Sequence, residues 1–408
     1  MAEHASTSLI SRRRALVVGV VALLLVVWVA AALGRPGPRP GLVPVIASTW
    51  VQPGTPFNVD PRGGVEEAVA VSGLGTVAAT NNQTPTPIAS LTKIMSALVI
   101  LHDHPLTLGE SGPSIVITPA DVAQYRLEKA RGDSVVAVRA GETISELQAL
   151  EMVLIPSGDN IMQILATWDA GTSQAFVAQM NALAHALGMR HTTYAGTSGV
   201  DPATLSTAND QLRLAQVAMS NPVFAGIVAM PQATFPVAGV VYNVNADLGT
   251  DGIDGVKTGW LPQSGGCLVV SAHDRVGSAR VTLLGVILGT QGVTPIPTAL
   301  RDGRHLIATL EQSVRQVELA AGSTVAHYQA ANGQVVPVVT ATALHLVALG
   351  ASAVRVTLGP RGSVPAQLAA GSTIGSVALS LGDQRVSSVV RTTSAISGSS
   401  LAWRFLHW

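Results

Sequence analysis

The stretch PIASLTKIMSALVIL, from Pro87 to Leu101, decides the fold of this 408-residue chain. It is apolar on nearly every face of a helix, and a helix that is apolar all round is buried. A serine and a lysine, Ser90 and Lys93, lie near its start, and their spacing of three residues places both side chains on one face. The sequence therefore predicts a buried central helix that carries a hydroxyl and an amine side by side.

Lysine is rare in this chain, which has three lysines and 21 arginines. Two of the three lie in short motifs, Ser90-Leu-Thr-Lys93 and Lys257-Thr-Gly259, whereas Lys129 lies in a charged stretch. Arginine stays protonated at any working pH, while a desolvated lysine can lose its proton and act as a base. We therefore expect amine chemistry at Lys93 and Lys257.

Ser90 has the features of an activated nucleophile. Pro87 places it near the first turn of the helix, where unpaired N–H groups and the positive end of the helix dipole lie. Its amide can help to hold an oxyanion, and Lys93 can deprotonate its hydroxyl. Apolar surroundings, the dipole and a nearby Lys257 would each lower the pKa of Lys93. Alone, the motif also fits a helix-capping serine and a lysine that reaches solvent.

The motif Lys257-Thr258-Gly259 is typical of an active-site edge strand. Gly259 would let a peptide-like substrate approach the backbone, and the N–H of Trp260 would supply a second oxyanion donor. Lys257 and Thr258 would bind a terminal carboxylate of the substrate. Between the two motifs, Ser157 could carry a proton between the lysines and a leaving amine, although a helix N-cap is the simpler interpretation.

The composition excludes several other functions. Charged residues make up 12 % of the chain and balance to zero, which argues against nucleic-acid binding. The single cysteine, Cys267, excludes an intramolecular disulfide, and its apolar neighbours favour a buried strand residue over a reactive thiol. No cluster of His, Cys and carboxylates has metal-ligand spacing, so we expect no metal and no cofactor.

The N-terminal segment predicts a membrane anchor. Residues 1–14, which end in three arginines, would be cytoplasmic, and the apolar residues 15–33 would form a transmembrane signal anchor. Residues 34–44 form a linker rich in proline and glycine, so the rest of the chain would be extracytoplasmic. A cleaved signal peptide is the alternative, because Ala30-Ala31-Ala32 offers small residues for a peptidase.

The remaining sequence predicts an α/β (α+β) catalytic domain over 45–316. We expect a hairpin of residues 65–71 and 76–80, the buried helix, a mainly helical block over 118–214, and a closing helix over 298–316. Three antiparallel strands complete the sheet, at 255–260, 267–272 and 280–288. Residues 317–398 would form a small all-β domain. The aromatic tail, 399–408, would pack on that domain or anchor at a membrane interface.

Taken together, the motifs resemble the low-molecular-weight penicillin-binding proteins, serine D-alanyl-D-alanine carboxypeptidases of peptidase family S11. Residues 87–95 resemble their nucleophile helix, and 67 and 100 residues separate Ser90, Ser157 and Lys257 in the family's order. The segments 154–160 and 254–259 resemble the second and third motifs, while 197–201 and 206–210 resemble further family segments. The resemblance covers about Gly64 to Leu310 and is weaker in the C-terminal β region.

The resemblance implies a penicillin-binding or β-lactamase-like transpeptidase fold and a penicillin-sensitive D,D-carboxypeptidase of the cell wall. Ser90 would attack the bond between the last two D-alanines of a peptidoglycan stem peptide, and β-lactams would acylate the same serine. The catalytic residues would be Ser90, Lys93 and Ser157. The substrate would meet Lys257, Thr258, Gly259, Trp260, Asp159 and Asn160. The chain would then be a single-pass protein of the cell membrane.

Asp159 departs from the family, which usually has asparagine third in the second motif. An ionised aspartate cannot donate a hydrogen bond, so either Asn160 takes over, or Asp159 is held protonated or acts as an acceptor. An ionised carboxylate would also raise the pKa values of both lysines. A catalytically weak scaffold is therefore one alternative. A class A-like β-lactamase is another, although no residue clearly supplies its deacylating glutamate.

Overall fold

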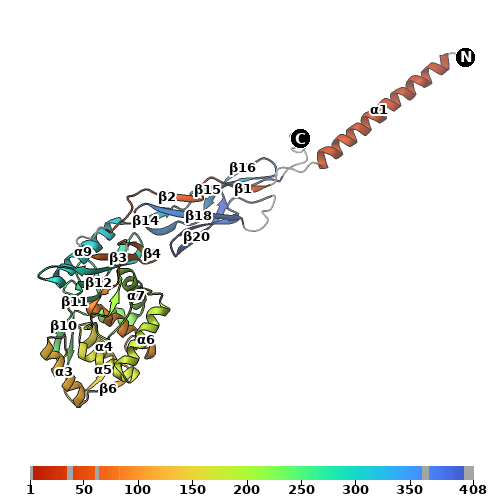
Figure 1. Cartoon of the computed structure of the whole chain (residues 1–408). Helices are drawn as coiled ribbons and strands as arrows, with labels where there is room; N and C mark the ends of the chain where they lie inside the picture. The colour runs from red at the N-terminus through yellow and green to blue at the C-terminus, as the bar shows by residue number, and fades with distance from the viewer. Residues whose placement is uncertain (1–2, 35–39, 60–63, 82, 361–366, 399–408) are drawn as a thin grey trace. The chain divides into compact units, whose positions relative to one another are not determined.

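The computed structural model describes residues 3–34, 40–59, 64–81, 83–360 and 367–398 (Figure 1). The chain divides into two compact units. The larger contains Gln52–Gln316 and Val347–Ser352, and the smaller contains the described residues of Met1–Val51, Val317–Leu346 and Ala353–Trp408. All residues of the predicted site lie in the larger unit.

A five-stranded antiparallel sheet forms one layer of the larger unit, in the order β11-β12-β13-β3-β4. The predicted meander and the predicted hairpin are both confirmed, and β13 pairs with β3 to join them. Apolar side chains dominate the central strands, as expected for a sheet that is buried. The strand bounds are β3 Glu66–Val71, β4 Gly75–Ala79, β11 Ile253–Leu261, β12 Gly265–Val276 and β13 Ala279–Thr290. Helix α9, Pro295–Ser313, packs against β12 and β13.

The predicted buried helix is confirmed as α2, Thr92–Asp103, which follows the short 3-10 helix η1, Ala89–Leu91. Every residue of α2 from Thr92 to Leu101 is buried. The helices packed against it are α4 Glu146–Leu154, α5 Asp159–Ala170, α6 Ser173–Ala186 and α7 Ala208–Ser220. Helix α3, Pro119–Arg131, packs on α5, and α8, Pro222–Val228, packs on α4 and α7. Side-chain caps start several of these helices. In α7, for example, the hydroxyl of Thr207 accepts from the backbone N–H of Asp210.

Three short strand pairs complete the larger unit. They are β5 Thr86–Pro87 with β8 Leu205–Ser206, β6 Ser114–Val116 with β7 Thr143–Ser145, and β9 Gln232–Phe235 with β10 Gly239–Tyr242. Residues 143–145, inside the block predicted to be mainly helical, thus form a strand, and α4 begins after them. Ser145 caps α4 by accepting from Gln148, and the two residues before it pair with β6.

The smaller unit contains a seven-stranded sheet in the order β1-β15-β16-β20-β19-β18-β2. Each element described between 319 and 398 is a strand, as predicted. The bounds of its strands are β1 Gly41–Pro44, β2 Thr49–Gln52, β15 Thr324–Gln329, β16 Val335–Thr340, β18 Ser352–Pro360, β19 Thr373–Leu381 and β20 Gln384–Thr392. A separate two-stranded sheet contains β14 Val314–Leu319 and β17 Leu344–Leu349. The linker predicted over 34–44 is wrong at its end, because Gly41–Pro44 pair with β15.

The N-terminal helix α1 spans Glu3–Gly34. Its segment Arg13–Ala31 is long and apolar enough to cross a membrane, and a signal sequence near an N-terminus meets the same criteria. The aromatic tail predicted at 399–408 lies outside the described residues.

Glu146, the first residue of α4, makes the stability of the larger unit depend on pH. Its side chain is buried, and neither carboxylate oxygen has a hydrogen-bond partner. Burial raises the pKa of Glu146 to about 7, and the charge of His104 opposes the rise. The folded state therefore keeps a proton that the unfolded state loses, and stability falls as the pH rises from about 4.5 to 7.

Glu146→Gln should remove this loss, because the amide carries no charge at any pH. We expect the wild type and the variant to unfold at similar temperatures near pH 4.5. Near pH 8 the variant should be more stable by about 1–3 kcal/mol, the usual cost of a buried unpaired polar group. Thermal unfolding followed by circular dichroism measures both values. An unchanged difference between the two proteins across this range would show that Glu146 does not titrate as described.

Candidate active site

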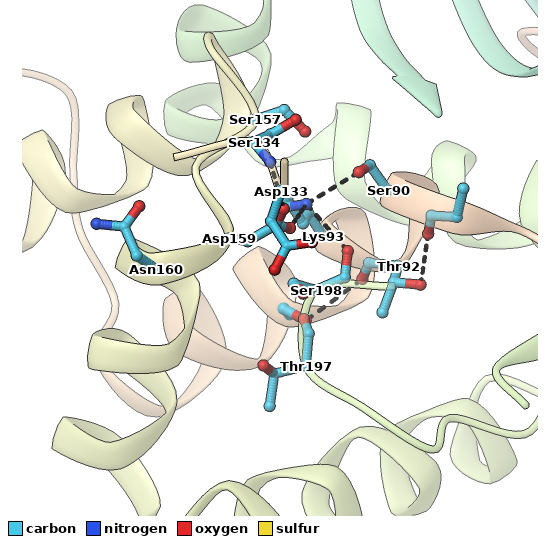
Figure 2. A network of polar contacts seen from close by, with 12 residues as sticks. Ser90, Thr92, Lys93, Asp133, Ser134, Ser157, Asp159, Asn160, Thr197 and Ser198 are labelled. Carbon is cyan, nitrogen blue, oxygen red and sulfur yellow. Dashed lines mark hydrogen bonds and ion pairs between the residues drawn. The ribbon is translucent and has the colours of Figure 1, made fainter. Parts of the chain in front are cut away.

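Ser90 and Lys93 lie against each other at the start of the buried helix (Figure 2). Ser90 is in η1 and partly buried, while Lys93 is on α2 and inaccessible to solvent. The Nζ of Lys93 donates to the Oγ of Ser90 at 3.0 Å. The spacing of three residues thus produces the contact that an amine needs in order to take a proton from a hydroxyl.

Two glycines allow other segments to approach the backbone at Ser90. Gly259 on β11 lies so close that a Cβ there would stand 2.9 Å from the backbone nitrogen of Ser90 and 3.1 Å from the Cβ of Ala89. Gly199, at a φ of 86°, packs directly against the carbonyl of Ala89. The sequence assigned Gly259 to substrate access, but the Cβ it lacks would meet the protein's own backbone.

Ser157 lies in the turn between α4 and α5 with a φ of 66°, a conformation that is uncommon outside glycine. The N-cap of α5 is Gly158, so the interpretation of Ser157 as an N-cap is wrong. Its Oγ instead accepts a hydrogen bond from the Nζ of Lys257 at 2.9 Å. A second hydroxyl and amine pair therefore lies in the same unit as the first.

Lys257 on β11 is buried, and it also donates to the backbone oxygen of Thr258 at 3.1 Å. In the part of the chain that the structure describes, no carboxylate forms an ion pair with Lys257. Burial lowers its pKa well below the usual value, the charge of Lys93 lowers it further, and Asp159 opposes both effects. Thr258 beside it is buried, and Trp260 is about half exposed.

Asp159 points into the site and Asn160 points away from it, as Figure 2 shows. The Oδ1 of Asp159 accepts from the Nζ of Lys93 at 2.6 Å, and its Oδ2 accepts from the backbone N–H of Ser134 at 3.0 Å. Both polar atoms of the Asn160 amide bind the backbone of Val136, each at 2.9 Å. Asn160 therefore holds a loop, and its amide is not free to replace the one that the family has at position 159.

Sequence reasoning missed two backbone groups of the site. The carbonyl of Ser198 accepts the third hydrogen bond from the Nζ of Lys93, at 3.0 Å, and the N–H of Ser134 binds Asp159. Ser198 lies in the segment 197–201, whose family resemblance was a usable signal. No motif marked Ser134.

Cys267 is a fully buried strand residue, and burial raises the pKa of its thiol to about 11. Over the described residues, no group of three or more His, Cys, Asp or Glu side chains has an arrangement that could hold a metal ion. The site thus offers two hydroxyls, each beside a buried amine, which is an arrangement suited to nucleophilic acyl transfer.

Comparisons with known proteins give a consistent result. A family model described as D-alanyl-D-alanine carboxypeptidase, peptidase S11, matches residues 72–292. The carboxypeptidase DacB2 of Mycobacterium tuberculosis is 37% identical over 153 residues, which are 37% of this chain and 48% of that protein. A D-alanyl-D-alanine endopeptidase of Pseudomonas aeruginosa is 34% identical over 191 residues, or 45% of this chain and 58% of the relative. The match thus spans about half the length of these relatives.

Among solved structures, penicillin binding protein 5 of Haemophilus influenzae superposes with a TM-score of 0.57 at 20% identity. The match covers 83% of this chain and 99% of the other. It confirms the predicted penicillin-binding fold.

Proposed function

The chain belongs to the D-alanyl-D-alanine carboxypeptidase family, peptidase S11, and we propose that it removes the terminal D-alanine from peptidoglycan stem peptides through an acyl-enzyme on Ser90. The observation that carries the proposal is the 3.0 Å contact between the hydroxyl of Ser90 in η1 and the amine of Lys93 at the start of the buried helix α2. The second pair, Ser157 and Lys257 at 2.9 Å, supports it.

In the proposed reaction, Ser90 Oγ loses its proton to Lys93 and attacks the carbonyl between the last two D-alanines. Backbone N–H groups of Ser90 and Trp260 hold the oxyanion. The leaving amine takes the hydroxyl proton of Ser157, which the ammonium of Lys257 replaces, and D-alanine departs. Water then hydrolyses the ester on Ser90 and frees the shortened peptide.

Substrate recognition would use Lys257 and Thr258, which bind the terminal carboxylate of the stem peptide by charge and by hydroxyl. Burial lowers the pKa of Lys257, but a bound carboxylate would oppose this effect and favour the protonated amine, because an opposite charge stabilises the charged form. Asn160 is not part of this proposal, because its amide is committed to Val136.

Two assays on the full-length chain in detergent test the function. Fluorescent penicillin should label the protein covalently, and a stem pentapeptide ending in D-Ala-D-Ala should release D-alanine. A β-lactamase would instead turn the penicillin over rapidly, and an endopeptidase would cleave cross-linked dimers in preference to the pentapeptide. Absence of both labelling and D-alanine release would favour the scaffold and overturn the proposal.

We also propose that α1 anchors the chain in the cell membrane with the larger unit outside the cytoplasm. The apolar segment Arg13–Ala31 and the three arginines at 12–14, at its N-terminal end, support this orientation. Protease added to intact spheroplasts should then degrade the larger unit. Full protection from the protease would contradict the orientation, and release of the protein into the medium would indicate a cleaved signal.

A further inference from the structure

As an ammonium group, Lys93 uses all of its N–H donors in hydrogen bonds. An ammonium group has three N–H donors, and Lys93 has three acceptors around it: Ser90 Oγ at 3.0 Å, Ser198 O at 3.0 Å and Asp159 Oδ1 at 2.6 Å. In this state Nζ has no lone pair directed at Ser90. Lys93 can act as a base only after one of its protons has left.

Of the three acceptors, only Asp159 can take that proton. Ser90 is the group to be deprotonated, and the carbonyl of Ser198 is a very weak base. The contact to Asp159 is the shortest of the three and joins two buried side chains, whose exposed fractions are 0% and 7%. In such a site the ion pair loses much of its advantage over the neutral pair, because charges are poorly solvated there.

We propose that Asp159 is a positioning residue that acts through Lys93 by accepting its proton during acylation. This inference rests on the proposed function. An Nζ proton of Lys93 moves to Asp159 Oδ1, and the freed amine takes the proton of Ser90 Oγ as that oxygen bonds to the substrate carbonyl. Asp159 ends as a neutral acid and Lys93 as an ammonium, while the negative charge moves to the oxyanion.

Among the residues that the structure describes, no other charged group near Lys93 and Asp159 is placed to accept the proton of Lys93. Lys257, across the site on β11, is bonded to Ser157 rather than to Asp159. On α3, Glu128 has its pKa raised by burial, with smaller increases from the charges of Asp159 and Asp133. Asp133, two residues after the end of α3, pairs with Arg131 at 3.0 Å. Neither acid contacts Lys93.

A rival interpretation makes the opposite prediction. If the carboxylate only holds Lys93 protonated, it slows acylation, and its removal should speed the reaction. If Asp159 accepts the proton, its removal forces Lys93 to lose a proton to solvent before it can act. The same variant, Asp159→Asn, therefore separates the two, because it keeps the shape and can still accept from Ser134.

The experiment measures the rate of acylation by fluorescent penicillin between pH 5 and 10. For Asp159→Asn we expect a fall of about 100-fold or more at pH 7, the usual effect of removing general-base assistance. In the variant, the rate should rise with pH, because Lys93 must first lose a proton to solvent. In the wild type, the fall in rate at acid pH would instead reflect protonation of the carboxylate. Asp133→Asn is the matched control and should follow the wild type.

A faster reaction at pH 7, with the acid limb at lower pH, would overturn the inference, and so would an unchanged profile. Asp159→Glu, which keeps a carboxylate, should keep the acid limb at low pH even if the rate falls, so the inference stays testable if the asparagine variant does not fold. A wild type that penicillin does not label would refute the proposed function itself. A labelled wild type with an equally active Asp159→Asn would refute this inference alone.

Discussion

Ser90→Ala is expected to abolish covalent labelling by fluorescent penicillin and to stop D-alanine release. The change removes one oxygen atom, which is the atom that would carry the acyl group. The side chain is partly buried, and its hydroxyl accepts a hydrogen bond from the amine of Lys93. Lys93 keeps its contacts with Asp159 and Ser198 in the variant, so the fold should survive. Gel fluorescence and a thermal melt measure the two effects.

Ser96→Ala provides the matched control for the nucleophile. Ser96 lies on α2, the buried helix that follows η1, and its hydroxyl donates to the carbonyl of Thr197 at 2.6 Å. We expect this variant to be labelled like the wild type, with a loss of about 1 kcal/mol in stability from the missing hydrogen bond. Persistent labelling in Ser90→Ala would show that penicillin reacts elsewhere.

Local sequence patterns predicted most of the larger unit. The buried helix follows from its apolar pattern, and the hairpin and the meander follow from short strand-like runs that are close in sequence; all three are confirmed. The error at Gly41–Pro44 has a different origin. These residues become a strand because they pair with Thr324–Gln329, far along the chain, and a proline-rich stretch gives no sign of such a partner.

The candidate site was predictable where chemistry and spacing lie close together in the sequence. Ser90 and Lys93 meet because three residues span one helical turn, and the resemblance placed Ser157 and Lys257 together. The sequence did not show which of two adjacent residues, Asp159 or Asn160, contributes to the site. Whether Asp159 or Asn160 faces Lys93 depends on how α5 is rotated, and the bonds of Asn160 to Val136 and of Asp159 to Ser134 fix that rotation.

The structure also changes what the departure at position 159 means. From the sequence, a carboxylate there opposes base catalysis, because it favours the charged form of both lysines. In the structure the carboxylate of Asp159 is bonded to Lys93 and not to Lys257. Lys257 therefore keeps a lowered pKa, and burial is the main cause. The two amines can then differ in charge, one cationic in an ion pair and the other more easily neutral beside Ser157.

Lys93→Arg is the second variant with a large expected effect. Arginine keeps the positive charge and can still pair with Asp159, but it does not give up a proton at any working pH. It can neither take the proton of Ser90 nor pass one to Asp159. We expect acylation by penicillin to fall by about 100- to 10,000-fold, the range for loss of a general base. Lys129→Arg, at an exposed position on α3, is the matched control and should react normally.

The pH dependence distinguishes this variant from Asp159→Asn. In Asp159→Asn a lysine remains, so alkaline pH should restore acylation. In Lys93→Arg the side chain at position 93 loses no proton in that range, so the rate should stay low up to pH 10. Acylation measured across pH in both variants thus tests whether Lys93 works as a base or only as a fixed charge. Near-normal acylation of Lys93→Arg at pH 7 would mean that a fixed charge is sufficient, and Ser90 would then need another base, for which the Ser157 and Lys257 pair is placed in the same unit.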